Sequence, residues 1–186
     1  MLEVEMKFPV KDFKTLEARL AEWQARQDEK REEADTYFKP PDRDFATTDE
    51  ALRIRRIGEA NFVTYKGPKI DSHTKTRTEL EVPLAPGNKT AEDFAKLLEH
   101  LRYRPVATVK KHRRIFHVHR QGFPLEISLD EVPGVGAFAE LEIQAEEGQL
   151  ENARAVLTQA AKELGLENSE RRSYLEMFLT RQKGKQ

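Results

Sequence analysis

The sequence has no cysteine and no long apolar run, and these two absences exclude several classes of protein. Without cysteine the chain forms no disulfide, no thiolate metal site and no thiol nucleophile. No stretch is apolar enough to span a bilayer, and the first residues lack the apolar segment of a signal peptide. We therefore expect a cytoplasmic protein that does not bind a membrane.

An excess of either charge is also lacking. The 32 lysines and arginines are balanced by 33 aspartates and glutamates, which gives a net charge of −1. Nucleic-acid-binding proteins normally carry a basic excess, so the basic clusters RIRR (53–56) and KKHRR (110–114) are weak candidates, and we expect no nucleic-acid partner. Charged residues nevertheless make up 35% of the chain, against about a quarter in a typical globular protein. Some of this charge should therefore do more than solvate the surface.

The 186 residues suffice for one domain with a sizeable core, and no linker or repeat divides them. We predict a single domain over residues 1–182 and a frayed tail over 183–186. Alternation with period two predicts strands, and apolar positions three to four residues apart predict helices. The predicted strands cover residues 2–8, 29–39, 51–57, 61–67, 74–84, 107–120, 124–132 and 138–145. The predicted helices cover residues 12–25, 90–101, 150–164 and 173–182, with caps at Asp12, Thr90 and Ser173 and a loop over 40–50.

In nearly every predicted strand, one face is apolar and the other is ionised. Glu3, Glu5 and Lys7 alternate with apolar residues in the first strand, and Arg53 and Arg55 do so in the third. Further charges in the same kind of position are Lys66, Glu79, Glu81, Lys111, Arg113, Glu126, Asp130, Glu140 and Glu142. Glutamate, lysine and arginine are not preferred strand residues, so this repeated pattern needs an explanation.

Two arrangements would satisfy the pattern. The first is an antiparallel sheet with one solvated face. The second is a closed barrel with the charges inside, whose apolar outer face is covered by the four helices. The pattern alone does not choose between the open sheet and the barrel.

A barrel with a charged interior is costly unless it binds a ligand, because buried ions need partners. The cations suit a polyanion, since the fork of an arginine matches phosphate oxygens. Carboxylates in the same cavity would repel that anion unless metal ions lay between them, and Mg²⁺ and Mn²⁺ bind carboxylates and bridge to phosphates. The residues therefore indicate a site for metal and polyphosphate.

A series of motifs follows this pattern along the chain. EVEMK (3–7) comes first, and DTYF, ALRIRR, TYKGP, RTELE, VKKHR, LDEVPGVGAFAELE and RRSYLEM follow in that order. Together they span nearly the whole chain and resemble the CYTH superfamily, the triphosphate tunnel metalloenzymes. Within it, PPDRDFATTDEALRIRR, GVGAFAELE and RRSYLEM are most similar to class IV adenylyl cyclases.

The resemblance implies an α+β fold, a closed eight-stranded antiparallel β-barrel with a charged interior and flanking α-helices. It also implies Mg²⁺ or Mn²⁺ as the cofactor. The implied metal ligands are Glu3, Glu5, Asp130, Glu140 and Glu142. The implied phosphate-binding residues are Lys7, Arg53, Arg55, Lys66, Lys111 and Arg113, of which Lys66, Lys111 and Arg113 are implied in catalysis together with Glu5. Glu79 and Glu81 lie where relatives place further acidic residues, and their role is left open.

The activity implied first is that of an adenylyl cyclase, which converts ATP to cyclic AMP and pyrophosphate. A triphosphatase acting on inorganic tripolyphosphate or thiamine triphosphate would use the same tunnel, and fold does not fix chemistry. A non-catalytic polyphosphate-binding module is a third alternative, although it would not need the carboxylates. Relatives are sometimes dimers, so a homodimer is left open.

The histidines of the chain have a simpler interpretation than metal binding. His117 and His119 could ligate a metal from one face of a strand, but such a pair more often lies on the surface at a strand end. His112 faces away from Lys111 and Arg113. We therefore assign no functional role to these three residues.

Overall fold

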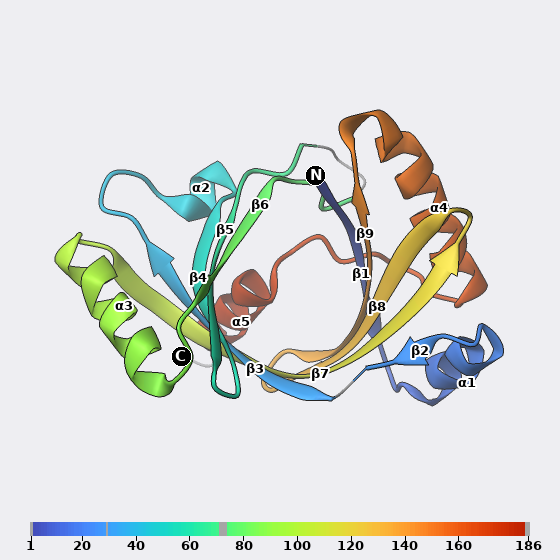
Figure 1. Cartoon of the computed structure of the whole chain (residues 1–186), viewed down its shortest axis with the longest axis horizontal. Coiled ribbons are helices and arrows are strands. Elements are labelled where there is room, and N and C mark those ends of the chain that lie inside the picture. The colour runs from blue at the N-terminus through green and yellow to red at the C-terminus, as the bar shows by residue number, and fades with distance from the viewer. Residues whose placement is uncertain (1, 29, 71–73, 185–186) are drawn as a thin grey trace.

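The computed structural model, which describes residues 2–28, 30–70 and 74–184, is built around one curled antiparallel sheet (Figure 1). Its strands are neighbours in the order β1-β9-β8-β7-β3-β4-β5-β6. They span Leu2–Val10 (β1), Arg31–Lys39 (β3), Ala51–Ile57 (β4), Ala60–Lys66 (β5), Glu79–Leu84 (β6), Arg104–Arg120 (β7), Phe123–Val132 (β8) and Gly136–Ala145 (β9). The two-residue strand β2 (Arg26–Gln27) pairs with β7 outside this order.

The two edge strands of this order, β1 and β6, come together where the sheet curls round. The backbones of Glu3 and Arg77 exchange two hydrogen bonds of 3.3 Å, two residues before β6 begins. The amide of Lys75 donates to the carbonyl of Glu5 at 2.9 Å. The prediction of an α+β fold with an eight-stranded antiparallel barrel is confirmed, and its closure rests on this short bridge rather than on a ladder between β1 and β6.

The ionised faces of the strands point into the barrel. Lys7 and Lys111 are only 1% and 3% exposed, and Asp35 is 2% exposed. On the opposite face of the sheet, Val4 and Leu141 are fully buried in an apolar cluster. Since both faces are buried, the charged face does not serve as a solvated surface.

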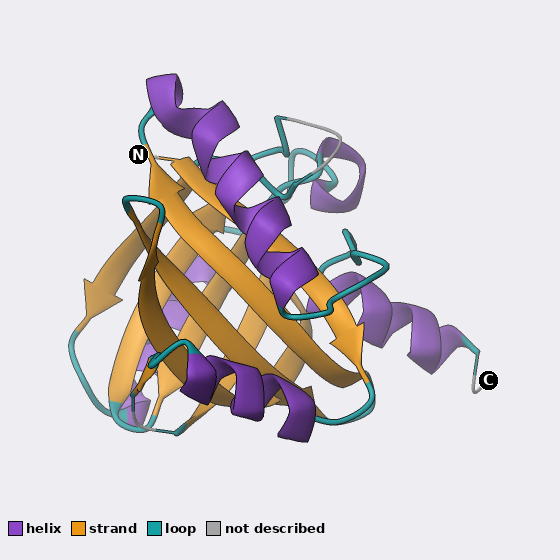
Figure 2. Cartoon of the chain, turned by 90° about the vertical axis from the view of Figure 1, so that its right-hand side faces the viewer, coloured by secondary structure: helices purple, strands orange, loops and turns teal. Residues whose placement is uncertain are grey.

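Helices cover the apolar outer face of the sheet (Figure 2). Helices α1 and α4 pack on β1, β8 and β9, where Leu20 and Leu157 join the largest apolar cluster. Helix α3 covers β3 and β4 through Ala91 and Leu98. Helix α5 is seen through the barrel opening in Figure 1, and its Tyr174 packs among residues of β7 and β9. The helices span Lys14–Glu22 (α1), Phe45–Thr48 (α2), Asn88–His100 (α3), Leu150–Glu163 (α4) and Tyr174–Lys183 (α5).

Of the predicted helix caps, Ser173 is confirmed, Thr90 is wrong, and Asp12 lies one residue before Phe13, the N-cap of α1. The Asp12 carboxylate accepts the Lys14 amide at 3.0 Å, and the Ser173 hydroxyl accepts the Glu176 amide at 3.1 Å as part of a capping box. The capping box predicted at Thr90 is wrong, because α3 already begins at Asn88. The residue before it is Gly87, whose φ of +97° favours glycine.

Several predicted boundaries also differ from the structure. The loop over 40–50 contains one helical turn, α2, because the carboxylate of Asp44 accepts the amide of Ala46 at 3.0 Å. Strand β6 begins at Glu79 rather than at residue 74, because the preceding residues bridge to β1. Residue 29, predicted to start a strand, and residues 185–186 of the predicted tail lie outside the described residues. No helix in the described part of the chain is long and apolar enough to cross a membrane.

Candidate active site

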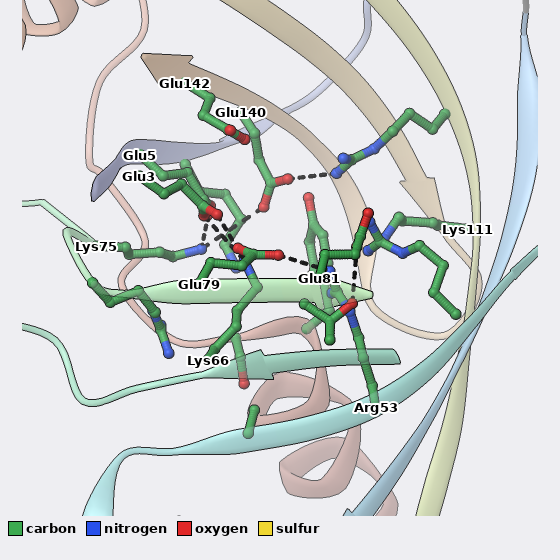
Figure 3. A pocket seen from close by; sticks show the side chains of 18 of the residues that line it. Glu3, Glu5, Arg53, Lys66, Lys75, Glu79, Glu81, Lys111, Glu140 and Glu142 are labelled. Carbon is green, nitrogen blue, oxygen red and sulfur yellow. Dashed lines mark hydrogen bonds and ion pairs between the residues drawn. The ribbon is translucent and has the colours of Figure 1, made fainter. Parts of the chain in front are cut away.

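The inward-facing side chains line a cavity of about 390 Å³ inside the barrel, which we call the tunnel cavity. Figure 3 shows glutamates of β1 and β9 on one side of it and Arg53 and Lys111 on the other. The residues that the sequence singled out and that line it are Glu3, Glu5, Lys7, Arg53, Arg55, Lys66, Glu79, Glu81, Lys111, Arg113, Glu126, Glu140 and Glu142. The fold therefore brings together side chains that lie up to 139 positions apart, from Glu3 to Glu142.

Four glutamates crowd together on neighbouring strands at one side of the tunnel cavity. Glu5 of β1 is the register partner of Glu142 of β9, which is also the partner of Glu126 of β8, and Glu3 shares the face of Glu5. Burial raises the pKa of Glu142 well above its usual value, and the charges of Glu3 and Glu126 raise it further. Burial also raises the pKa of Glu3, against the attraction of Lys66. Ionising all four carboxylates at once is therefore unfavourable unless a further cation enters the cluster.

A divalent cation is a group that fits this crowding of carboxylates. Carboxylate oxygens are the preferred protein ligands of Mg²⁺ and Mn²⁺, and Glu3, Glu5 and Glu142 present theirs to one cavity. Among the described residues, no three acidic or histidine side chains are already gathered around a common metal position. Lysine ammonium groups lie between the carboxylates instead, so binding a cation here requires these ion pairs to rearrange.

One of these ammonium groups belongs to Lys75, a residue that the sequence analysis missed. Its Nζ lies 2.5 Å from Glu5 Oε1 and 3.7 Å from Glu140 Oε1, and Lys75 is only 5% exposed. Burial opposes the ionisation of Glu5, but the charges of Lys75, Lys66 and Lys7 together outweigh it and lower the pKa of Glu5 to about 2. Lys75 therefore neutralises two of the carboxylates that the resemblance assigns to metal. A signal for it was present, because the stretch TKTRTELE alternates and places Lys75 on the same face as Glu79 and Glu81.

Replacing Lys75 by methionine should make the metal-free protein less stable and increase its affinity for metal. The change leaves Glu5 without its nearest cation and removes one of the two cations beside Glu140, and with it a charge with which a bound Mn²⁺ would compete. Two unit charges 4 Å apart interact by about 4 kcal/mol at an effective dielectric constant of 20. We expect the half-saturating Mn²⁺ concentration to fall about tenfold, which needs about 1.4 kcal/mol of this energy. Thermal melts over a series of Mn²⁺ concentrations measure both effects.

Lys89→Met is a matched control, because Lys89 is an exposed residue of α3 that pairs with Asp93 far from the tunnel. We expect this control to leave the half-saturating Mn²⁺ concentration unchanged. If Lys75→Met requires the same Mn²⁺ concentration as the unmodified protein, or more, competition between Lys75 and metal is contradicted.

The opposite wall of the tunnel cavity is organised by Asp35 of β3. Its carboxylate accepts two hydrogen bonds of 2.8 Å from Arg55, one of 3.0 Å from Lys111 and one of 3.2 Å from Arg53. Glu33, on the same face, adds ion pairs to Lys111 at 2.7 Å and to Arg55 at 3.2 Å. Burial opposes the ionisation of Asp35, but the three cations outweigh it and hold its pKa well below the usual value. Two buried carboxylates thus fix the positions of three cations.

Glu33 and Asp35 were missed in the sequence, although a signal for them was present. The stretch REEADTYFK places Glu33, Asp35 and Tyr37 on one face of a strand by the same alternation that identified the other inward-facing charges. The three cations that they hold, in contrast, were all predicted to line the tunnel.

At the α5 end of the tunnel cavity, Lys7 lies against aromatic rings. Its Nζ is 4.2 Å from the ring centre of Tyr174 and 5.7 Å from that of Phe138, and it donates to the carbonyl of Arg172. Burial lowers the pKa of Lys7 to about 7, and the nearby charge of Lys75 contributes to this shift. Lys7 can therefore change its protonation near neutral pH.

Asp130 is placed differently from the other implied metal ligands. It is fully buried behind the wall and does not line the tunnel cavity. Its Oδ1 accepts a 2.7 Å hydrogen bond from Nε of Arg113, and its Oδ2 accepts a 2.8 Å bond from the hydroxyl of Tyr174. Asp130 orients Arg113, whose guanidinium also donates to Glu140 at 2.5 Å.

His112, His117 and His119 lie away from the tunnel cavity. Nε2 of His117 lies 2.8 Å from Oδ2 of Asp28, and His119 is exposed on the same strand. His112 lies beside Glu32 on the outer face. None of the three lines the tunnel cavity.

Comparison with protein families matches this chain to the CYTH domain over residues 1–174. The chain belongs to the CYTH domain family. The matched range includes every residue that the sequence analysis assigned to metal or phosphate. The charged barrel interior is thus the interior of a CYTH domain.

Individual relatives of this CYTH protein cover nearly its whole length. It is 37% identical over 182 residues to "Putative adenylate cyclase MJ0240" of Methanocaldococcus jannaschii, which covers 95% of this chain and 98% of the relative. It is 32% identical to "Adenylate cyclase CyaB" of Aeromonas hydrophila, over 92% of this chain and 86% of the relative. Among solved structures, the PH1819 protein of Pyrococcus horikoshii OT3 is 38% identical with a TM-score of 0.84, over 96% and 98% of the two chains.

Proposed function

We propose that this CYTH protein is an enzyme that acts on triphosphates with Mg²⁺ or Mn²⁺ as its cofactor. The observation that carries the proposal is the two-sided tunnel cavity, in which crowded glutamates of β1 and β9 face a wall of buried arginines and lysines. A phosphate chain between these walls would meet cations on one side, and a divalent cation would bridge it to the carboxylates on the other. A site for a bare anion would need no glutamate cluster, so the carboxylates argue against a module that only binds polyphosphate.

The residues of the cationic wall would bind and orient the phosphate chain. Arg53, Arg55 and Lys111 are already held by Asp35 and Glu33, so their charges need little reorganisation when an anion enters. Such preorganised charges stabilise negative charge that develops during phosphoryl transfer. Lys66, Arg113 and Lys7 would contact the same chain. Lys7 could also hold or release a proton at its Nζ, because its pKa lies near 7.

The carboxylates of β1 and β9 would hold the metal. The residues proposed as ligands are Glu3, Glu5, Glu140 and Glu142, while Asp130 would act through Arg113 rather than as a ligand. When bound, the metal would neutralise charge on the phosphate chain and on the leaving group. Glu79 and Glu81 line the same cavity, and we assign them no separate role.

The reaction that we propose first is that of an adenylyl cyclase. The 3′-hydroxyl of ATP attacks the α-phosphorus, a new phosphorus–oxygen bond closes the ring, and pyrophosphate leaves. The names of the two relatives that are 37% and 32% identical support this choice.

A triphosphatase is the second candidate, in which water attacks the terminal phosphorus, the bond from that phosphorus to the bridging oxygen breaks, and the diphosphate leaves while orthophosphate forms. The fold also occurs in HpAC1 from Hippeastrum, 16% identical with a TM-score of 0.68, which is described as having a dominant triphosphatase activity. Because the same tunnel can support both reactions, the nucleophile that reaches the phosphate chain decides between them.

A product assay tests the proposed function. The purified protein is incubated with Mg²⁺ or Mn²⁺ and, separately, with ATP, tripolyphosphate and thiamine triphosphate. Cyclic AMP with pyrophosphate from ATP is the expected result. Orthophosphate release without cyclic AMP would replace the cyclase by a triphosphatase, and binding of triphosphate without any product would leave only the binding module.

A further inference from the structure

A second cavity lies next to the tunnel cavity, beyond the rim of the barrel. It has a volume of about 560 Å³, within the range of small-molecule sites. Its wall is the continuation of the inner faces of β7 and β8, and the turn after α1 and strand β2 complete it through Gln24 and Arg26. We call it the mouth cavity.

The β7–β8 hairpin extends past its neighbours to form this wall. The pairing of β8 with β9 ends at Glu126 and Glu142, so the β8 residues before Glu126 extend beyond β9. On the other side, β3 pairs with β7 only as far as Arg113, and β2 continues the sheet at His117. Figure 1 shows this hairpin curling away from the barrel near β2 and α1.

The mouth cavity and the tunnel cavity share part of their walls. Glu126, Glu142 and Gln144 line both of them. These residues lie on the inner face of adjoining strands, since Glu126 is the register partner of Glu142 and Gln144 follows on the same face. A ligand that fills the tunnel cavity can therefore continue into the mouth cavity past the glutamate cluster.

The chemistry of the mouth cavity differs from that of the tunnel. Its arginine, Arg26, pairs with Asp28 at 2.6 Å, and His117 pairs with the other oxygen of the same carboxylate at 2.8 Å. Both of these side chains thus already contact the one carboxylate of Asp28. The cavity also presents the exposed ring of His119 and the exposed Pro124, which offer flat surfaces.

The geometry points to the mouth cavity as the binding site for the heteroaromatic ring of a ring-bearing triphosphate, such as a nucleobase. This inference rests on the proposed function and names the class of substrate that the site would accept. The phosphate chain lies in the tunnel cavity, and the ring lies against the imidazoles of His117 and His119, since bases stack on aromatic side chains including histidine. The amides of Gln24 and Gln144 border the cavity and can hydrogen-bond to the edge of the ring.

The test compares a ligand that has a ring with one that lacks it. Binding of α,β-methylene ATP and of tripolyphosphate is measured by calorimetry in Mg²⁺ for the unmodified protein, His119→Ala and the double variant His117→Ala/His119→Ala. Loss of a stacked side chain typically weakens base binding by about tenfold. We expect this loss for the nucleotide and a change of less than about twofold for tripolyphosphate, which has no ring to lose contact with.

His112→Ala is the matched control, because His112 lies on the same strand but on its outer face. His119 is exposed, so its variant remains informative if the double variant fails to fold. Equal effects on both ligands, or no effect on either, would overturn the assignment of the mouth cavity while triphosphate binding itself stands. Failure of the unmodified protein to bind either ligand would overturn the proposed function and this inference with it.

Discussion

The Glu142→Gln variant is expected to lose about 100-fold or more in the turnover of a triphosphate, the size of effect seen when one stabilising group is removed from an active site. Without added metal, the same variant should melt at a higher temperature than the unmodified protein. Glu142 is half-buried beside Glu3 and Glu126, and its removal from water together with the charges of these two glutamates raises its pKa. The amide removes this repulsion, and each kcal/mol regained raises the melting temperature by about 2–4 °C.

The gain in stability should depend on pH in a defined direction. A carboxyl group whose pKa is raised in the folded state contributes stability below its ordinary value of 4.5, and this contribution is lost as the pH rises through the folded-state pKa. Without metal, the unmodified protein should therefore melt at a lower temperature than Glu142→Gln at neutral pH. Near pH 4.5 the two melting temperatures should be equal. Thermal melts at both pH values measure this difference.

Glu131→Gln is the control for this prediction, since Glu131 is an exposed residue of β8 that does not line the tunnel cavity. It should change neither the turnover nor the dependence of stability on pH. If Glu142→Gln kept its activity, Glu142 would not be a metal ligand. If the variant were less stable than the unmodified protein at neutral pH, the crowding of the glutamates would be contradicted.

The Asp35→Asn variant should show the largest loss of stability. Asp35 is 2% exposed and compensates Arg53, Arg55 and Lys111 at 2.8–3.2 Å. Removing one partner of a buried ion pair costs about 3–5 kcal/mol, which corresponds to a fall of about 10 °C in melting temperature for a chain of this size. Tripolyphosphate should restore part of this loss, because the three cations then have an anion to bind.

The stability difference between the unmodified protein and Asp35→Asn should also shrink in acid. The pKa of Asp35 is lowered on folding, so its contribution is present above the ordinary value of 3.8 and is lost as the pH falls through the folded-state pKa. Urea titrations at pH 7 and below pH 3.8 measure the difference. Asp93→Asn, on the exposed face of α3, should have little effect at either pH. A similarly small effect of Asp35→Asn at pH 7 would contradict its role in the cationic wall.

The fold was predictable because each inward-facing charge follows a rule of period two. Glu3, Glu5 and Lys7 lie on one face of β1 independently of how the neighbouring strands pair. The motifs that resemble the CYTH superfamily then predicted that the sheet closes into a barrel. The exact ends of the elements were less predictable, since Gly87 and Asp44 start helices through local backbone geometry and capping that the apolar pattern does not contain.

The contents of the site were predictable and its internal pairing was not. The side chains predicted to line the tunnel do so, apart from Asp130, which the fold places behind Arg113. Which carboxylate meets which cation depends on the register between strands distant in sequence, such as Lys111 with Asp35. Lys75 shares the alternation of Glu79 and Glu81, but its contact with Glu5 depends on the bridge between its segment and β1, which only the structure shows.

The central claim of this account is that the glutamate cluster and the cationic wall form one site for metal and triphosphate together. Calorimetric titration of Mn²⁺ into the protein, with and without saturating tripolyphosphate, tests it most directly after correction for Mn²⁺ bound by free tripolyphosphate. We predict that tripolyphosphate increases the affinity for Mn²⁺ by about tenfold or more, because coupled sites reinforce each other's binding. This coupling should disappear in Glu142→Gln. An equal Mn²⁺ affinity in both titrations, or coupling that survives Glu142→Gln, would contradict the claim.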